Sequence, residues 1–358
     1  MSAPSPDHVP DAPRAGRAIR SLALWTGVGT FLLIVVGGIV RVSDSGLGCG
    51  SAGSGFHGWP LCEGDVIPGV DLHAVIEYTH RALASALAIM MFALAVLAWR
   101  RHRAQRGLVR ATIACAGLIV AQGLLGAATV EKGLDEALVA AHLGLAMLLL
   151  GLLVYVWRAT GPEALDEPRG ASPPEPGPAP RAGPGARALA LGASAAVFLT
   201  ILAGGYMAGT QNYGRPDYRL GDGAHHACGK EFPTCNGSFL PFGRARLVDI
   251  HLTHRVFMYI ASLLVITLVV LVLRRGQGGD AVRSAKLLLL LLCVQVLVGA
   301  LNVWLDEYEA LIVLHLALGT LLWATVVTLT LQLHRVPSPA GERAAPERAG
   351  ARPAAVTA

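Results

Sequence analysis

The segment IEYTHRAL (residues 76–83) places an acid, a histidine and an arginine within five residues and then runs directly into an apolar stretch. The segment IHLTHRVF (residues 250–257) repeats the pattern, with His251 at the position that Glu77 holds in the first. A polar group inside a membrane is costly unless it has a partner or a task. The question is what two apolar helices gain from these side chains.

Composition places the chain among polytopic membrane proteins. Of its 358 residues, 53% are hydrophobic and only 15% are charged, which is unusual for a soluble domain. Eight apolar stretches are long enough to cross a hydrocarbon core of about 30 Å as helices. They cover residues 22–40, 76–98, 111–130, 137–157, 188–210, 251–273, 287–305 and 310–333. We therefore predict an all-α polytopic membrane protein with eight transmembrane helices.

The positions of Lys and Arg predict the orientation in the membrane. With the N-terminus inside, 20 of the 29 Lys and Arg fall in inside segments and 7 in outside loops, as the positive-inside rule requires. We therefore expect a multi-pass protein of the cell membrane whose N- and C-termini are both cytoplasmic. The formal net charge of +5 is then a consequence of topology. It points to the lipid bilayer as the partner and does not indicate nucleic-acid binding.

An internal repeat divides the chain into two halves. The first half contains EYTHR, AQGLLGAATV and AAHLGLA in that order, and the second contains HLTHR, VQVLVGALNV and VLHLALG. The distance from Gln122 to His142 is 20 residues, as is the distance from Gln295 to His315. The repeat predicts two pseudo-symmetric four-helix bundles. The expected parts are a cytoplasmic N-terminal tail (1–21), an N-terminal unit (22–158), a Pro/Gly-rich cytoplasmic linker (159–187), a C-terminal unit (188–335) and a disordered cytoplasmic tail (336–358).

Four histidines form two pairs on this topology. His80 and His142 lie at similar depth on the second and fourth helices, and His254 and His315 repeat this arrangement. Two imidazoles at one level, on helices able to face each other, suit bis-histidine ligation of a haem iron inside a bundle. Zinc would need three or four nitrogen or sulfur ligands, and only His251 is placed to serve as a third ligand. For any one histidine, a hydrogen-bonded interface residue is the alternative.

The residues around these histidines differ between the halves. Glu77, His80 and Arg81 share one helical face because they are spaced i, i+3 and i+4. If His80 holds iron, Arg81 is in range of a haem propionate, and Arg255 has the matching place in the second half. A snorkelling arginine or a Glu77–Arg81 ion pair is the alternative. Because His251 replaces the glutamate, we expect one reactive site and one auxiliary site.

Four of the six cysteines fall in the two long outside loops. Cys49 and Cys62 share the first loop, and Cys228 and Cys235 share the second. Since the outside is oxidising, one disulfide in each loop is expected. A redox-active role for the pairs is the alternative to a structural one.

These segments resemble a known family. GGIVRVSDSGLGC, GWPLCEG, IEYTHR and AAHLG in the first half, with CGKEFPTCNG, THR and LHLALG in the second, closely resemble bacterial haem A synthases over about residues 20–335. The resemblance implies a membrane haem-dependent oxidoreductase that oxidises the C8 methyl group of haem O to a formyl group by successive hydroxylations, for terminal oxidases. It implies substrate haem near His80 and His142, a haem b held by His254 and His315, a functional Glu77, and a disulfide in each outer loop. The first cysteine pair encloses twelve residues, where the family commonly has about six.

Two other functions compete with this one. A bis-histidine di-haem b-type electron carrier would need two similar sites, which the exchange of Glu77 for His251 argues against. A haem transporter or chaperone would be expected to show broken helices near the midplane. The expected partners of the enzyme are haem O, an electron donor, and the farnesyltransferase that makes haem O, because a free apolar haem is poorly soluble. We expect the haem sites toward the extracytoplasmic side.

Overall fold

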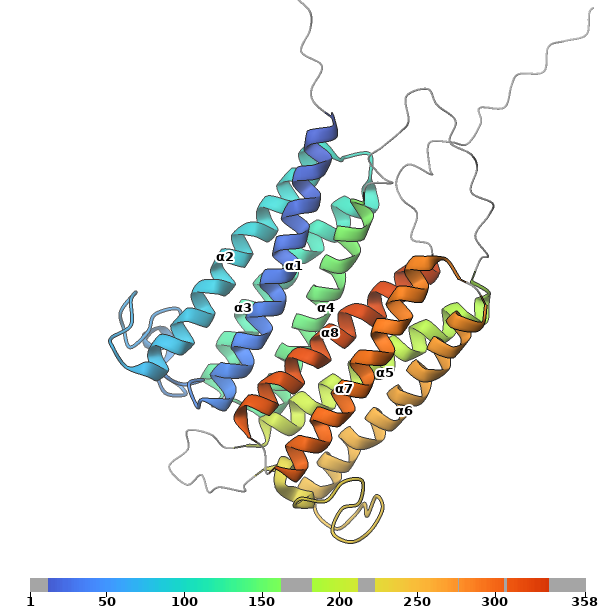
Figure 1. Cartoon of the computed structure of the whole chain (residues 1–358). Coiled ribbons are helices and arrows are strands. Elements are labelled where there is room, and N and C mark those ends of the chain that lie inside the picture. The colour runs from blue at the N-terminus through green and yellow to red at the C-terminus, as the bar shows by residue number, and fades with distance from the viewer. Residues whose placement is uncertain (1–11, 162–181, 212–222, 276, 306–307, 335–358) are drawn as a thin grey trace, which may run out of the picture.

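Eight long helices make up the protein (Figure 1). The computed structural model describes residues 12–161, 182–211, 223–275, 277–305 and 308–334. The helices are α1 (Ala12–Val42), α2 (Leu72–Arg101), α3 (Arg106–Glu131), α4 (Glu136–Ala159), α5 (Pro184–Gly209), α6 (Arg246–Arg274), α7 (Gly279–Trp304) and α8 (Glu309–His334). All eight are long and apolar enough to cross a membrane, and over the described ranges no strand longer than an isolated bridge accompanies them. The predicted class is confirmed.

The helices extend beyond the apolar stretches that predict them. The largest difference is in α7, which begins at Gly279 instead of residue 287. Its first turns, GDAVRSAK, are helical, but they are too polar for a hydropathy criterion to include them in the apolar stretch. Likewise α1 begins at Ala12, inside the segment expected as a polar tail. Most of the expected linker and all of the expected C-terminal tail lie outside the described residues.

Aspartate caps fix where two of the helices begin. The side chain of Asp71 accepts from the amide of Ala74 at 3.0 Å at the start of α2, and Asp135 accepts from Ala137 and Leu138 at the start of α4. Such caps satisfy amide groups that have no partner within the helix. They set the register of the two helices that hold the first histidine pair.

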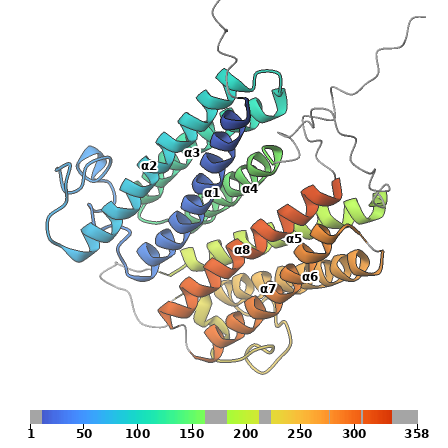
Figure 2. The ribbon, with the colours of Figure 1, turned by 45° about the horizontal axis from the view of Figure 1, so that its top comes forward.

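The helices form two four-helix units. In the N-terminal unit, α1 and α3 each pack against both α2 and α4, so α2 and α4 lie diagonally across the core. In the C-terminal unit, α5 and α7 pack in the same way against α6 and α8. Both ribbon views show the two groups side by side (Figures 1 and 2). The helix that carries the first histidine of each pair therefore lies opposite the helix that carries the second.

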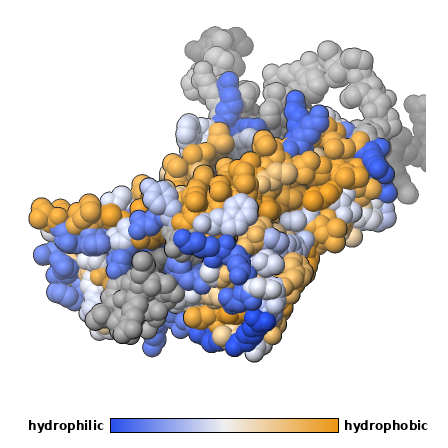
Figure 3. Space-filling view, turned by 60° about the horizontal axis from the view of Figure 1, so that its bottom comes forward, coloured by the Kyte–Doolittle hydropathy of each residue, from blue (hydrophilic) through white to orange (hydrophobic). Residues whose placement is uncertain are grey.

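Both cysteine-containing loops lie at the same end of the helices (Figure 1). This end, formed by residues 43–71 and 223–245, is called the disulfide end below. The turn between α2 and α3 lies at the opposite end. Figure 3 brings the disulfide end forward and shows hydrophilic residues gathered there, with a broad hydrophobic surface along the helices.

Polar contacts join the two units at several depths. Near the disulfide end, Arg41 of α1 donates to the carbonyl of Ala208 at 3.0 Å and so satisfies a carbonyl group at the end of α5. Deeper in the molecule, the indole nitrogen of Trp323 in α8 donates to the carbonyl of Met147 in α4 at 2.7 Å. The units are thus fixed together through backbone groups as well as through apolar packing.

Two glycine–leucine contacts repeat across this interface. A β-carbon built on Gly38 of α1 would lie 2.6 Å from Cδ2 of Leu316 in α8. A β-carbon built on Gly205 of α5 would lie 3.0 Å from Cδ2 of Leu143 in α4. Each leucine directly follows the fourth-helix histidine of its own unit. The close approach of the units therefore depends on glycine at both positions and places the interface beside the histidine pairs.

Candidate functional site

The four histidines lie at matched depths. His80 and His254 each stand eight residues after the first residue of their helix, and His142 and His315 each stand six residues after it. At a rise of 1.5 Å per residue these offsets are about 12 Å and about 9 Å. All four helices begin at the disulfide end. The two imidazoles of a unit are therefore near one level on diagonal helices.

The packing of the helices places each pair inside one unit. The helix of His80 lies across the core from the helix of His142, and the helices of His254 and His315 are arranged in the same way. Because the two histidines of a pair differ in depth by only about 3 Å, each predicted pair lies near one level of its own unit.

Each of the four imidazole rings lies against a glycine of a neighbouring helix. A β-carbon on the glycine would approach the ring carbon Cε1 to between 2.9 and 3.3 Å in all four cases. The contacts are Gly37 with His80, Gly126 with His142, Gly204 with His254 and Gly299 with His315. Separations this short leave almost no room for a methyl group, so glycine defines a slot for each ring. We call these four positions the ring glycines.

Hydrogen bonds orient the rings of the C-terminal unit. His254 donates from Nδ1 to the carbonyl of Thr200 at 3.0 Å, which leaves Nε2 as the nitrogen with a free lone pair. The side-chain amide of Gln295 donates to Nε2 of His315 at 3.2 Å. That contact identifies Nε2 of His315 as an acceptor, the form of imidazole nitrogen that binds a metal.

The rings of the N-terminal unit have fewer partners. Gln122 lies at the position equivalent to Gln295, but its amide donates to the backbone carbonyl of His142 at 3.0 Å. Nδ1 of His80 and Nδ1 of His142 are buried and make no hydrogen bond to any described residue. A buried nitrogen without a partner is costly. The first pair is therefore held mainly by its ring glycines.

These donor sets fit a haem better than a bare metal ion. Within the described ranges, no three His, Cys, Asp or Glu side chains come together as a metal site. A haem iron needs only two protein ligands because the porphyrin supplies the others. Paired imidazoles on diagonal helices match that requirement in both units.

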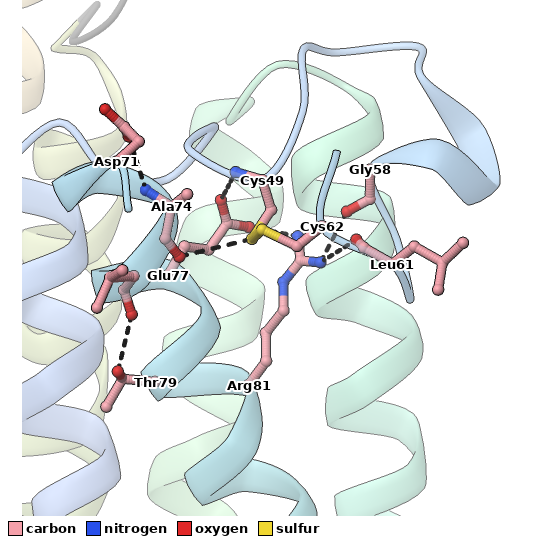
Figure 4. The surroundings of a disulfide bond; sticks show 10 residues. Cys49, Gly58, Leu61, Cys62, Asp71, Ala74, Glu77, Thr79 and Arg81 are labelled. Carbon is pink, nitrogen blue, oxygen red and sulfur yellow. Dashed lines mark hydrogen bonds and ion pairs between the residues drawn. A yellow bond between two sulfur atoms is a disulfide. The ribbon is translucent and has the colours of Figure 1, made fainter. Parts of the chain in front are cut away.

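Glu77 and Arg81 attach the first disulfide loop to α2 (Figure 4). Glu77 is only 4% exposed, and its Oε2 accepts from the amide of Cys49 at 2.8 Å. Its other oxygen pairs with Arg81, which also donates to the carbonyls of Gly58 at 2.7 Å and Leu61 at 3.0 Å. The ion pair considered from the sequence is thus present, and both side chains hold the loop over the helix.

The C-terminal unit attaches its loop from the same two helix positions. Arg255 donates to the carbonyls of Thr234 and Glu231, each at 2.8 Å. His251, which replaces the glutamate, donates from Nδ1 to the carbonyl of Ala224 at 2.8 Å. The loop docking is therefore common to both units, whereas the carboxylate is present only in the first.

Both loops are closed by disulfides. The structure joins Cys49 to Cys62 and Cys228 to Cys235, which is the predicted pairing. All four cysteines are at most 1% exposed. Since Cys49 also donates to Glu77, the first disulfide is connected directly to the carboxylate beside the histidine pair.

Sequence reasoning missed the ring glycines and the role of Thr200. A signal for two of the glycines was available, because Gln122 precedes Gly126 by four residues and Gln295 precedes Gly299 by four. Residues four apart share a helical face. The repeated spacing of glutamine and glycine therefore marked the surface of the third helix that meets the fourth-helix histidine.

Comparison with known proteins agrees with this geometry. Residues 20–327 match the COX15-CtaA family, described as cytochrome oxidase assembly protein. The chain belongs to this family. The matched range of the cytochrome oxidase assembly family includes all four histidines, both disulfides and Glu77.

Several relatives within the family bear one name. A protein named heme A synthase from Halalkalibacterium halodurans is 26% identical over 321 residues, covering 89% of this chain and 98% of its own length. Another of that name from Symbiobacterium thermophilum is 30% identical over 292 residues, covering 80% and 85% of the two chains. A third from Alkalihalophilus pseudofirmus is 26% identical over 321 residues. The similarity therefore extends over both units.

Proposed function

We propose that the chain is a haem A synthase, a membrane oxidoreductase that oxidises the C8 methyl group of haem O to a formyl group and so supplies haem A to terminal oxidases. The observation that carries this proposal is the pair of histidine sites on one duplicated frame, of which only the first has a buried carboxylate, Glu77. The names of the family relatives agree with it. Two sites with different surroundings suit a substrate haem and a resident haem.

The N-terminal unit is the substrate site in this proposal, with His80 and His142 as the ligands of haem O. Neither imidazole of this pair has a hydrogen-bond partner at Nδ1 among the described residues, so no hydrogen bond at Nδ1 has to break as a substrate enters and leaves. The C-terminal unit holds haem b through His254 and His315. The bond from His254 to Thr200 fixes a ring in advance, as suits a cofactor that stays. Haem b supplies one-electron redox chemistry when bound.

Glu77 is the proposed chemical residue of the substrate site. Oxidising a methyl group removes protons and electrons and builds positive character at the carbon atom. A buried carboxylate stabilises that charge strongly because the surroundings have low dielectric, and it is also a group able to accept a proton. The contacts to Cys49 and Arg81 hold the carboxylate in place before the substrate arrives.

Arg81 and Arg255 are proposed to contact haem propionates in addition to holding the loops. A guanidinium group has five N–H donors, and the loop carbonyls use only some of them. The Nε of Arg255 is buried and has no hydrogen-bond partner among the described residues. This N–H group can therefore donate one more hydrogen bond, and a propionate is the acceptor that a haem would bring.

The disulfide end is proposed to face the extracytoplasmic side of the cell membrane, with both termini in the cytoplasm. The two disulfides support this orientation because disulfides persist in oxidising compartments. The excess of Lys and Arg in the opposite segments supports it as well. The haem O-forming farnesyltransferase is the proposed partner for substrate delivery.

The proposal is tested by expressing the chain in a host that makes haem O but lacks haem A, and then extracting the pigments. The expected result is a haem with the absorption of a formyl porphyrin, absent from the same host with an empty vector. If only haem B and haem O are recovered while the purified protein contains haem, the chain is a haem-binding electron carrier and the proposal fails.

A further inference from the structure

A groove lies where α4, α5 and α6 meet, with a cavity volume of about 610 Å³. It belongs to neither histidine core, and its walls include both units. The residues used below are Leu199, Ala203 and Tyr206 of α5 and Arg246, Asp249 and Phe257 of α6. Leu199 is 42% exposed, so the groove opens on the surface that meets lipid.

The groove is polar at one end and apolar at the other. Tyr206, Arg246 and Asp249 lie near the disulfide end, because α5 ends and α6 begins there. Phe257 lies eleven residues further along α6 than Arg246, which is about 16 Å deeper in the membrane. A ligand with a small polar head and a long apolar tail matches this gradient.

The charges at the polar end select the kind of head group. Arg246 is paired with Glu136 of α4, and the hydroxyl of Tyr206 lies 3.4 Å from Arg246 and 3.5 Å from Glu136. Asp249 adds a second carboxylate. Two carboxylates beside one guanidinium repel an anionic phosphate head. They suit instead a neutral head with hydroxyl donors, which carboxylate oxygens accept.

The groove lies next to the C-terminal histidine site. Thr253 lines the groove and directly precedes His254. Ala203 lines it as well and directly precedes Gly204, the ring glycine on which His254 rests. A redox-active ligand in the groove would therefore lie close to the His254 imidazole, with only the neighbouring residues of α5 and α6 between them.

We propose that this groove binds an isoprenoid quinol, with its ring between Tyr206 and Asp249 and its tail along Leu199 and Phe257. The inference rests on the proposed function, because hydroxylation of a methyl group by O2 takes up two electrons and two protons for each oxygen atom inserted, while the second oxygen atom leaves as water. Oxidation of one quinol to the quinone releases two electrons and two protons. The electrons would leave the quinol one at a time through the single haem b iron, which would pass the first electron to the substrate site and O2 before it takes up the second. The protons leave through the carboxylate cluster to the aqueous phase at the disulfide end.

The experiment uses the full chain with its haem b in quinone-free lipid nanodiscs. Anaerobic mixing with decylubiquinol is followed by the appearance of reduced b-type absorbance. The wild-type rate should saturate with quinol concentration. Leu199→Trp, which fills the groove, should lower the rate at least tenfold, and Tyr206→Phe, which removes one hydroxyl, should lower it several-fold. Dithionite should reduce the haem of every variant equally.

Leu191→Trp is the matched control. It makes the same change on the same helix, at a leucine that is 56% exposed and two turns away from the groove, and it should behave as the wild type does. Photolabelling with an azido-quinone should mark α5 or α6 in the wild type and lose that label in Leu199→Trp. Unchanged reduction and labelling in Leu199→Trp, or a rate that never saturates, would overturn the proposal.

The two proposals fail separately. Saturable, groove-dependent reduction without haem A formation in the expression host would leave the quinol site standing and remove the synthase. If haem A forms in the expression host but the haem b of Leu199→Trp is reduced by quinol and the protein is photolabelled as in the wild type, the synthase proposal stands and the quinol site is removed.

Discussion

The two units place their histidines at the same depths but hold them differently. His254 is fixed by a hydrogen bond to Thr200, whereas Nδ1 of His80 has no partner among the described residues. Beside them, Glu77 and His251 both dock a loop, one as an acceptor and the other as a donor. Duplication thus preserved the docking function at this position while changing its charge. In the proposed function, this one change of residue type would give a frame that holds two haems a single reactive site.

The largest expected effect comes from removing ligands of the C-terminal unit. His254→Ala or His315→Ala should eliminate most of the low-spin b-type absorbance of the purified protein, because a bis-histidine iron loses one of its two protein ligands. His80→Ala should leave that absorbance in place. The spectrum of each variant provides the measurement. If both C-terminal variants retain the full wild-type spectrum, the assignment of resident and substrate units is wrong.

Glu77→Gln tests the charge difference between the units. Glutamine keeps the size and an acceptor for the Cys49 amide but removes the negative charge, so haem A formation should fall by about 100-fold or more. Haem O or a hydroxylated product should accumulate while haem b stays normal. His251→Gln, which keeps a donor for the Ala224 carbonyl, is the control and should sustain haem A formation. Near-normal haem A from Glu77→Gln would leave this residue with only its structural contacts.

The ring glycines test the difference in how the imidazoles are held. Gly204→Ala should shift the midpoint potential and the low-spin spectrum of haem b, because the His254 ring is fixed by the Thr200 carbonyl and packs tightly on Gly204 of the same helix. Gly37→Ala should leave haem b unchanged and raise the KM for haem O several-fold, because the added methyl group would displace the His80 ring of the substrate unit. Gly192→Ala, on α5 with no atom within 4 Å of the added methyl, is the control. Equal effects of both ring-glycine variants on haem b would contradict the comparison.

The smallest effect concerns the disulfides. The first spans 13 residues and the second spans 7, so loop entropy predicts that removing the first destabilises the protein by about 0.5 kcal/mol more. Thermal unfolding of the Cys49→Ser/Cys62→Ser and Cys228→Ser/Cys235→Ser proteins measures this difference. Only the first variant should also lower haem A formation, since only Cys49 contacts Glu77. A larger loss of stability in the second variant would contradict the loop-length argument.

Much of the fold could be predicted from the sequence because membrane spans and duplication leave long signals. The eight apolar stretches and the equal spacing of Gln122–His142 and Gln295–His315 define the helices and their matched depths. Helix ends were less predictable. The first turns of α7 are polar, and a hydropathy pattern does not distinguish a polar helical turn from a loop.

The details of the site depended on contacts between distant residues. Arg81 and Arg255 were interpreted as propionate contacts from their place beside a histidine, but each guanidinium also binds carbonyls more than 19 residues earlier in the chain. The ring glycines are equally non-local, since Gly37 and His80 belong to different helices. Periodicity within one helix predicts which residues share a face, but it does not identify what that face meets.

The paired glycine–leucine contacts between the units have the form of an isologous interface. Gly38 of the first unit receives Leu316 of the second, and Gly205 of the second receives Leu143 of the first, as in a dimer related by a two-fold axis. Each unit therefore contains both halves of a self-complementary joint. A homodimer of a single four-helix unit would close through the same two contacts, and fusion of two such genes would preserve that symmetry within one chain.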